Sequence, residues 1–159
     1  CGSPPLFRAS RGRAMQKINI VCVGKLKEKF FSDAVNEYLK RLSRFASVTV
    51  RELAEKRTLR EEAENILKEL RGACVVLAVE GKKLSSETFA EKMKRFADEG
   101  KEVTFVIGSS CGLSESVKAR ADLLLSFSDM TFPHQLMRVI LCEQIYRTFM
   151  INGGGEYHK

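Results

Sequence analysis

Hydrophobic positions along the chain fall into two kinds of run, and each kind predicts a different element. Short runs rich in β-branched residues predict buried strands. Longer runs in which apolar residues recur every three or four positions predict helices with one buried face. Because the two kinds alternate, they predict an α/β fold with a mostly parallel sheet and flanking helices. The five strand runs are residues 18–23, 48–53, 73–79, 103–107 and 123–127.

The helical runs carry start signals of their own. Thr58 followed by Glu61 forms a capping box, so we expect a helix to begin there and to run to the glycine at position 72. Ser85 and Ser86 are candidate caps of the next long helix. Pro133 suits the first turn of the last helix.

The last helical run is apolar around most of its circumference, which is more than one contact face requires. A second buried surface, such as a dimer interface, would explain this broad arc. Its apolar residues are Leu136, Met137, Ile140, Leu141, Ile145, Tyr146 and Phe149.

The two ends of the chain differ from the part between them. Residues 1–14 contain two adjacent prolines, no acidic residue and no periodicity. We expect this stretch to be a disordered leader or cloning remnant, followed by one domain over residues 15–159. Three consecutive glycines from Gly153 predict a mobile tail when the chain is isolated.

Charge and cysteine content narrow the class of protein. The formal net charge is +7, and three arginines of the leader account for part of it, which leaves +4 (7 − 3) on the folded part. This mild excess permits RNA contact without demanding it. The five cysteines have no paired spacing, which fits a reducing cytoplasm and argues against a zinc site. The cysteine pattern leads us to expect no bound metal and a cytoplasmic location. Since charges interrupt every long apolar run, we also expect no membrane span.

Ligands of such sheets bind beyond the carboxyl ends of the strands, which directs attention to the loops that follow residues 79, 107 and 127. The segment 106–112 (VIGSSCG) offers small residues whose backbone amides a nucleotide can approach, but an ordinary strand-to-helix turn fits it equally well. The segment 125–133 (LSFSDMTFP) is unusually apolar for a turn. It is either packed under the last helix or forms a pocket for a flat heteroaromatic ring.

Four polar residues near the end of the chain are candidates for contact with a substrate. His134 and Arg138 lie one helical turn apart just beyond the apolar loop, where a solvated helix start is the alternative. Tyr157 and His158 have no core to join, so they are either functional or part of a disordered terminus.

Several blocks of the chain together resemble one family. They are VGKLK at 23–27, LSSE at 84–87, VIGSSCGL at 106–113, and SFSDMTFPHQLMR at 126–138, continuing through EQIYR at 143–147 to Tyr157-His158. The chain resembles the ribosomal large-subunit pseudouridine N3-methyltransferases, which are minimal SPOUT (α/β-knot) proteins. This resemblance implies a C-terminal trefoil knot, a feature that the rarity of threaded chains would otherwise exclude.

The resemblance also implies the cofactor and its site. The cofactor would be S-adenosyl-L-methionine. The cofactor-binding residues carried over are Leu77, Gly108, Phe127, Ser128, Asp129, Met130, Thr131 and Phe132. The catalytic candidates are His134, Tyr157 and His158 as proton acceptors or orienting groups, and Arg138 as a ligand for a phosphate or a uracil-like carbonyl.

The partners implied by the resemblance are a second copy of the chain and the ribosome. In the homodimer the last helix would pack across the interface, and the tail of one subunit would complete the site of the other. The substrate would be a pseudouridine in 23S ribosomal RNA on the assembled ribosome. Five lysines could contact phosphates: Lys25, Lys27, Lys29, Lys82 and Lys83.

Two rival interpretations remain open. One is a flavodoxin-like module that binds a nucleotide or flavin without catalysing methyl transfer. The other is a catalytically silent ribosome-associated factor. Ser109 stands where relatives usually have a second glycine, and three glycines precede Glu156 where many relatives have an arginine-glycine-glutamate run.

Overall fold

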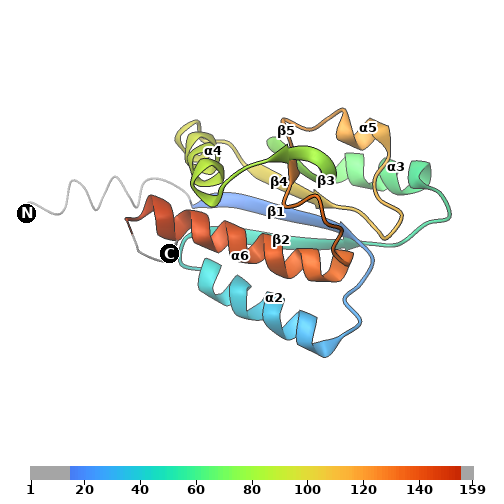
Figure 1. Ribbon diagram of the computed structural model, residues 1–159, viewed down its shortest axis with the longest axis horizontal. Helices are drawn as coiled ribbons and strands as arrows, with labels where there is room; N and C mark the ends of the chain where they lie inside the picture. The colour runs from blue at the N-terminus through green and yellow to red at the C-terminus, as the bar shows by residue number, and fades with distance from the viewer. Residues whose placement is uncertain (1–14, 155–159) are drawn as a thin grey trace, which may run out of the picture.

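Parallel strands form the central sheet in the order β2-β1-β4-β3-β5 (Figure 1). The computed structural model describes residues 15–154 of the chain. Every pairing in this sheet is parallel, so the predicted α/β class is confirmed. The strands are β1 (Gln16–Val23), β2 (Ala46–Leu53), β3 (Ala73–Lys83), β4 (Val103–Ile107) and β5 (Leu123–Ser126).

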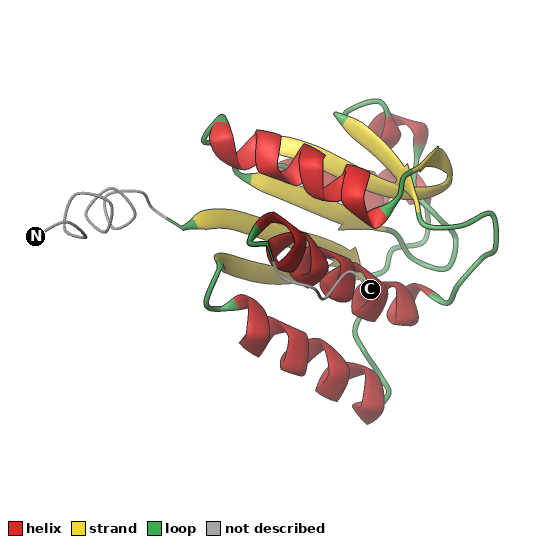
Figure 2. Ribbon diagram, turned by 60° about the vertical axis from the view of Figure 1, so that its left-hand side comes forward, coloured by secondary structure: helices red, strands yellow, loops and turns green. Residues whose placement is uncertain are grey.

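Helices cover both faces of this sheet (Figures 1 and 2). On one face lie α2 (Lys29–Leu42), α4 (Ser86–Asp98) and α6 (His134–Asn152), with α6 packed between the other two. On the opposite face lie α3 (Leu59–Glu69) and the short α5 (Glu115–Lys118). Among the described residues, none of these helices has the length and apolarity needed to span a membrane.

The alternation of side chains along β1 divides the core in two. Ile18, Ile20 and Cys22 point into the core beneath α2, α4 and α6. Val21 and Val23 point into the smaller core beneath α3 and α5. A strand that is buried on both faces needs apolar residues at consecutive positions, which explains the unbroken run of β-branched residues in the sequence.

The capping residues predicted from the sequence do cap α3 and α4, although some helix ends differ by a few residues from the prediction. The Thr58 side chain accepts a hydrogen bond from Glu61 N, and Ser85 accepts one from Thr88 N. Pro133 precedes the first helical residue instead of occupying the first turn. The helix α3 ends at Glu69, three residues before the expected glycine, because Leu70 is already extended with a ψ of 128°.

The strand β3 is longer than predicted. We expected it to end at residue 79, but it continues to Lys83 through a bulge, since both Leu77 and Lys82 align with Leu125 of β5. Gly81 makes this possible: a Cβ there would lie 2.7 Å from the carbonyl oxygen of Leu124. A bulge re-aims the residues it contains. Here those residues turn toward the loop that follows β4.

Candidate functional site

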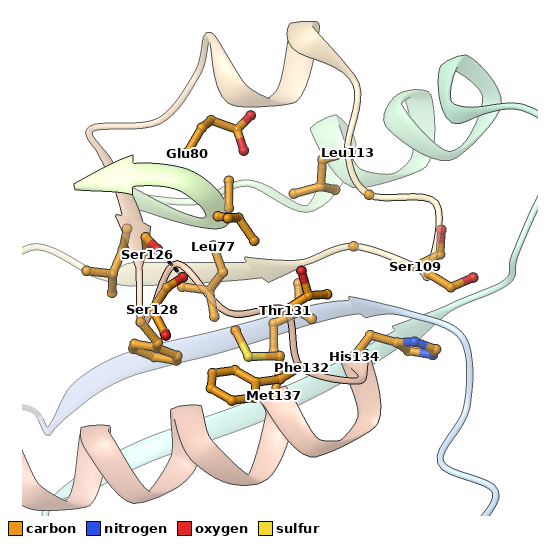
Figure 3. A pocket seen from close by; sticks show the side chains of 18 of the residues that line it. Leu77, Glu80, Ser109, Leu113, Ser126, Ser128, Thr131, Phe132, His134 and Met137 are labelled. Atoms are coloured by element: carbon orange, nitrogen blue, oxygen red, sulfur yellow. Dashed lines mark hydrogen bonds between the residues drawn. The ribbon is translucent and has the colours of Figure 1, made fainter. Parts of the chain in front are cut away.

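The carboxyl ends of β3, β4 and β5 enclose a cavity of about 240 Å³ (Figure 3). Its walls come from three segments: the β3 bulge at 78–80, the loop at 108–113 and the loop at 126–132. Two of these walls are loops that the sequence indicated, since parallel strands bring their carboxyl ends to one edge. The third is the β3 bulge, at the place where the sequence indicated a loop after residue 79.

The wall after β4 is a tight loop whose first residue must be glycine. A Cβ on Gly108 would lie 2.5 Å from the carbonyl oxygen of Gly112 and 2.7 Å from Cγ of Leu113. The loop is closed by a hydrogen bond of 2.9 Å from Gly112 N to Ser109 O. The backbone of Gly108 therefore faces the cavity without a side chain in between.

Ser109 is part of this wall through its hydroxyl group. Ser109 Oγ donates to Oε1 of Glu62 at 3.3 Å and accepts from the amide of Cys111 at 3.3 Å. Glu62 is only 5% exposed, and its other carboxylate oxygen accepts from Lys56 N at 3.0 Å. Ser109 stands where a second glycine was expected, and its hydroxyl group thus connects the loop to Glu62 of α3.

The wall after β5 is ordered by serines. Ser126 Oγ donates to Ser128 O at 2.9 Å, and Ser128 Oγ accepts from Met130 N at 3.0 Å. Phe127 and Phe132 line this cavity and also a second one between α4 and α6. Phe127 packs against the main core as well. The apolar loop is therefore both packed under the last helix and part of a pocket wall.

Asp129 is the exception among the residues expected to bind the cofactor. Its side chain is exposed and forms an ion pair of 2.6 Å with Lys83 Nζ, outside the cavity lining. Its neighbours Ser128 and Met130 line the cavity, whereas the ion pair with Lys83 holds Asp129 outside it. The expected residues that do line the cavity are Leu77, Gly108, Phe127, Ser128, Met130, Thr131 and Phe132.

The structure separates His134 from Arg138. His134 lies at the mouth of the cavity, at the start of α6 (Figure 3). The Arg138 side chain is 2% exposed, donates to the Glu52 carboxylate, and donates to Gly24 O at 2.5 Å. Arg138 lies one helical turn after His134, and its side chain points to the carboxyl ends of β1 and β2 instead of the cavity mouth. It does not reach the cavity, so direct contact with a substrate is not what this geometry provides.

Glu52 and the glycine carbonyl were not among the residues singled out from the sequence. The pairing of Cys22 with Glu52 across β1 and β2 places this carboxylate beside the buried arginine. The sequence shows only that Glu52 is a charged residue near the end of an alternating strand, and such residues are also common on exposed sheet edges without any function. Tyr157 and His158, like the leader at 1–14, lie outside the described residues.

A second pair that the sequence did not indicate lines the cavity itself. Glu80 of the bulge accepts a hydrogen bond of 2.5 Å from Lys118 Nζ of α5. This bond lowers the pKa of Glu80 and raises that of Lys118. Their proximity depends on the β3 bulge, which has no clear sequence signal.

None of the cysteines in the described part of the chain lines the cavity. Burial raises the pKa of Cys22 to about 11 and that of Cys142 to about 12. Both thiols are therefore protonated and unreactive near neutral pH. Residues 15–154 contain no group of three or more His, Cys, Asp or Glu side chains placed to hold a metal ion.

The sequence match to known proteins covers nearly the whole fold just described. The family model described as "Predicted SPOUT methyltransferase" matches residues 16–158. The chain belongs to the SPOUT methyltransferase family. It is therefore a methyltransferase, and membership in this family implies the knotted C-terminal arrangement that the sequence resemblance led us to expect.

Individual relatives agree with this family assignment. A Lactobacillus acidophilus protein named ribosomal RNA large subunit methyltransferase H is 48% identical over 157 residues, which is 89% of this chain and 99% of the relative. Proteins of the same name from Bifidobacterium animalis subsp. lactis and Streptococcus pyogenes are 52% and 45% identical, with 89% and 90% of this chain and 99% of each relative covered. The family match leaves the flavodoxin-like interpretation without support.

Proposed function

We propose that this SPOUT methyltransferase transfers a methyl group from S-adenosyl-L-methionine to N3 of a pseudouridine in 23S ribosomal RNA. The observation that supports this most is the three-walled cavity, because its lining carries every cofactor-binding residue expected from the family resemblance except Asp129. The names of the relatives support the large ribosomal subunit as the location of the substrate.

The described residues fit S-adenosylmethionine, which would supply an electrophilic methyl group on a sulfonium. Leu77 gives an apolar floor, and the phenyl rings of Phe127 and Phe132 suit a flat heteroaromatic base. Gly108 lines the cavity without a side chain, and its lack of a Cβ lets the loop at 108–113 fold tightly on itself. Hydroxyls and backbone groups at Ser128 and Thr131 offer polar contacts.

The chain's own contribution to methyl transfer is alignment and proton removal. Attack on the methyl group requires a ring nitrogen to be held in line with the sulfonium and to lose its proton. His134 at the cavity mouth is placed to accept that proton or to orient the base. We propose Tyr157 and His158 as further orienting groups from the tail. Arg138 acts as a positioning residue, because its buried bonds fix the first turns of α6.

The proposed RNA surface uses lysines of the segment that follows β1 and of the last residues of β3. Lys25, Lys27, Lys29, Lys82 and Lys83 are exposed and could contact phosphates. Lys83 already pairs with Asp129, but an exposed pair of this kind adds little free energy and can be exchanged for a phosphate. A modest charge excess favours the assembled ribosome, located in the cytoplasm, over free RNA.

The proposed assembly is a homodimer that packs through α6. Several apolar residues of this helix remain only half-buried in one chain: Leu136, Ile140, Met150 and Ile151. Ile140 also lines the second cavity, which shares Phe127 and Phe132 with the first. A partner helix seated there would close the cavity wall after β5 from its other side.

The decisive experiment is transfer of a labelled methyl group from S-adenosylmethionine to ribosomes that lack the modification. Intact ribosomes, isolated large subunits and naked ribosomal RNA are compared, and the modified nucleotide is identified by mass spectrometry. We expect label at N3 of a pseudouridine in large-subunit RNA. Cofactor binding without transfer would favour the silent ribosome-associated factor. Label at another position would overturn the proposed substrate.

A further inference from the structure

An exposed aromatic ring lies at the start of α2, shortly after the segment that contacts the start of α6. Phe30, in the first turn of α2, is 64% exposed, whereas its neighbour Phe31 is half-buried. The two ring centroids are 4.5 Å apart and the rings are tilted by 53°. Phe31 therefore supports Phe30 from below and leaves the ring of Phe30 open to solvent.

The chain before Phe30 is tied to the start of α6. Lys27 N donates to Oε1 of Gln135 at 3.2 Å, and Gln135 follows His134 directly. Gly24 O accepts from the buried Arg138. Figure 1 shows α2 and α6 beginning at the same end of the molecule. The segment that leads to Phe30 is thus held against the start of α6, where His134 lines the cavity.

A further bond secures the same loop against the sheet. Leu26 N donates to Oε2 of Glu52 at 3.3 Å, and this carboxylate also binds Arg138. Two elements remote in sequence, β2 and α6, therefore both anchor the four residues after β1. A ring held in this way loses little conformational entropy when a ligand stacks on it.

The charges around Phe30 favour an anionic partner. Three exposed lysines lie near Phe30 in the sequence: Lys25, Lys27 and Lys29. The acidic residues of the same stretch are Glu28 and Asp33. Lys29 and Asp33 form an exposed ion pair of 2.7 Å, which leaves a positive excess around the ring. An aromatic side chain flanked by lysines is the combination that single-stranded nucleic acids recognise, with the base on the ring and the phosphates on the lysines.

A second copy of the chain fits this surface less well. A two-fold symmetric contact centred on Phe30 would place each lysine cluster against its own copy, and like charges would repel. A stable protein interface also needs a broad apolar core. Among the described residues the other large exposed apolar side chains are Met15, Val79 and Met130, of which Val79 and Met130 line the cavity instead.

We infer that Phe30 is a stacking platform for an unpaired nucleotide of ribosomal RNA that neighbours the methylated base. Lys25 and Lys27 hold the phosphates on either side of that nucleotide. The platform lets the enzyme select an RNA loop in which both bases are splayed out. This inference rests on the proposed function and names the recognition element of the same site.

The test uses three variants of the full chain and unmodified ribosomes. Phe30→Leu removes the ring but keeps an apolar side chain, and Phe30→Trp keeps a ring. Lys94→Ala is the control for an exposed substitution on a different helix, because Lys94 lies on α4 in an exposed i,i+4 pair with Asp98. Methyl transfer is measured against ribosome concentration, S-adenosylmethionine affinity by calorimetry, and oligomeric state by light scattering.

For Phe30→Leu we expect a roughly tenfold higher KM for ribosomes, with kcat within about twofold and unchanged cofactor affinity. Phe30→Trp and Lys94→Ala should stay within about twofold of the wild-type chain. An unchanged KM in Phe30→Leu, an equal loss in Phe30→Trp, or an altered oligomeric state would overturn the platform. No transfer by the wild-type chain would instead remove the proposed function itself, so the two failures are distinguishable.

Discussion

At the scale of single residues, Gly108 is the position at which one added carbon matters most. Replacement by alanine places a Cβ against backbone atoms of Gly112, which cannot rotate away as a side chain can. The loop would have to shift into the cavity or away from it. We expect Gly108→Ala to weaken S-adenosylmethionine binding by about tenfold or more, because a shift near 1 Å disrupts close backbone contacts.

Calorimetric titration with S-adenosylmethionine measures this effect directly. Ser110→Ala is the matched control, since Ser110 lines the same cavity but is exposed and its substitution adds no atom. A Gly108→Ala chain that binds the cofactor as tightly as the wild-type chain would show that the loop is not a cofactor wall.

The buried thiols give a prediction about pH. Burial holds the pKa of Cys22 at about 11 and that of Cys142 at about 12, above the ordinary value of 9.0. The folded state therefore favours the protonated thiols. Their contribution to stability is complete below pH 9 and is lost as the pH rises toward the folded values. Denaturant titrations should show a falling free energy of unfolding between about pH 9 and pH 11.

Alkylation at pH 8 offers an independent check of the same burial. Among the cysteines of the described part of the chain, the exposed Cys111 should react first, and Cys22, Cys74 and Cys142 only when the chain unfolds. Peptide mapping by mass spectrometry identifies each labelled site. Rapid labelling of Cys142 in the native protein would mean that α6 opens readily from the sheet.

At the scale of elements, the sequence predicted most strands and helix starts because periodicity and capping are local properties. Thr58 and Ser85 cap helices as expected, and residues 103–107 form β4 within the predicted limits. The extension of β3 escaped prediction because it depends on Gly81 letting β5 approach, which is a contact between distant segments. Element types are thus easier to read than their ends.

The helix α3 begins with a side-chain cap at Thr58, so removing that cap tests how much it stabilises the fold. Thr58→Ala removes the side-chain acceptor for Glu61 N and should cost about 1 kcal/mol in the free energy of unfolding. Urea denaturation measures it. Ser114→Ala is the control, because Ser114 precedes α5 without a side-chain cap bond and should change stability by less than about 0.5 kcal/mol. Equal costs in both variants would contradict the role of the cap.

At the scale of the whole molecule, the place of the site was readable from the sequence, but the direction of its side chains was not. Parallel strand ends meet at one edge, so the three loops could be brought together by rule. Nothing local distinguishes Asp129, which pairs with Lys83, from the cavity-lining residues on either side. Likewise, the burial of Arg138 depends on Glu52, a partner 86 positions away.

The broad apolar surface of α6 leads to a prediction about assembly. We expect the chain to be a homodimer whose α6 helices pack together, as their half-buried residues suggest. Light scattering should give twice the mass of one chain. Leu136→Arg would place a charge in that interface and should yield monomers, whereas a substitution at the exposed Lys94 should not. A monomeric wild-type chain would exclude this assembly.

Shared sites between the two subunits can be tested by complementation. One chain carries Gly108→Ala and an intact tail, and the assay uses an S-adenosylmethionine concentration too low to fill its weakened cavity. The other chain has an intact cavity but lacks residues 155–159. If one subunit's tail completes the other's cavity, a mixed dimer contains one intact site. Half of randomly mixed dimers are of this kind, so activity should return to about a quarter of the wild-type level. If each tail instead serves its own cavity, mixing restores nothing, because the intact cavity and the intact tail stay on different chains.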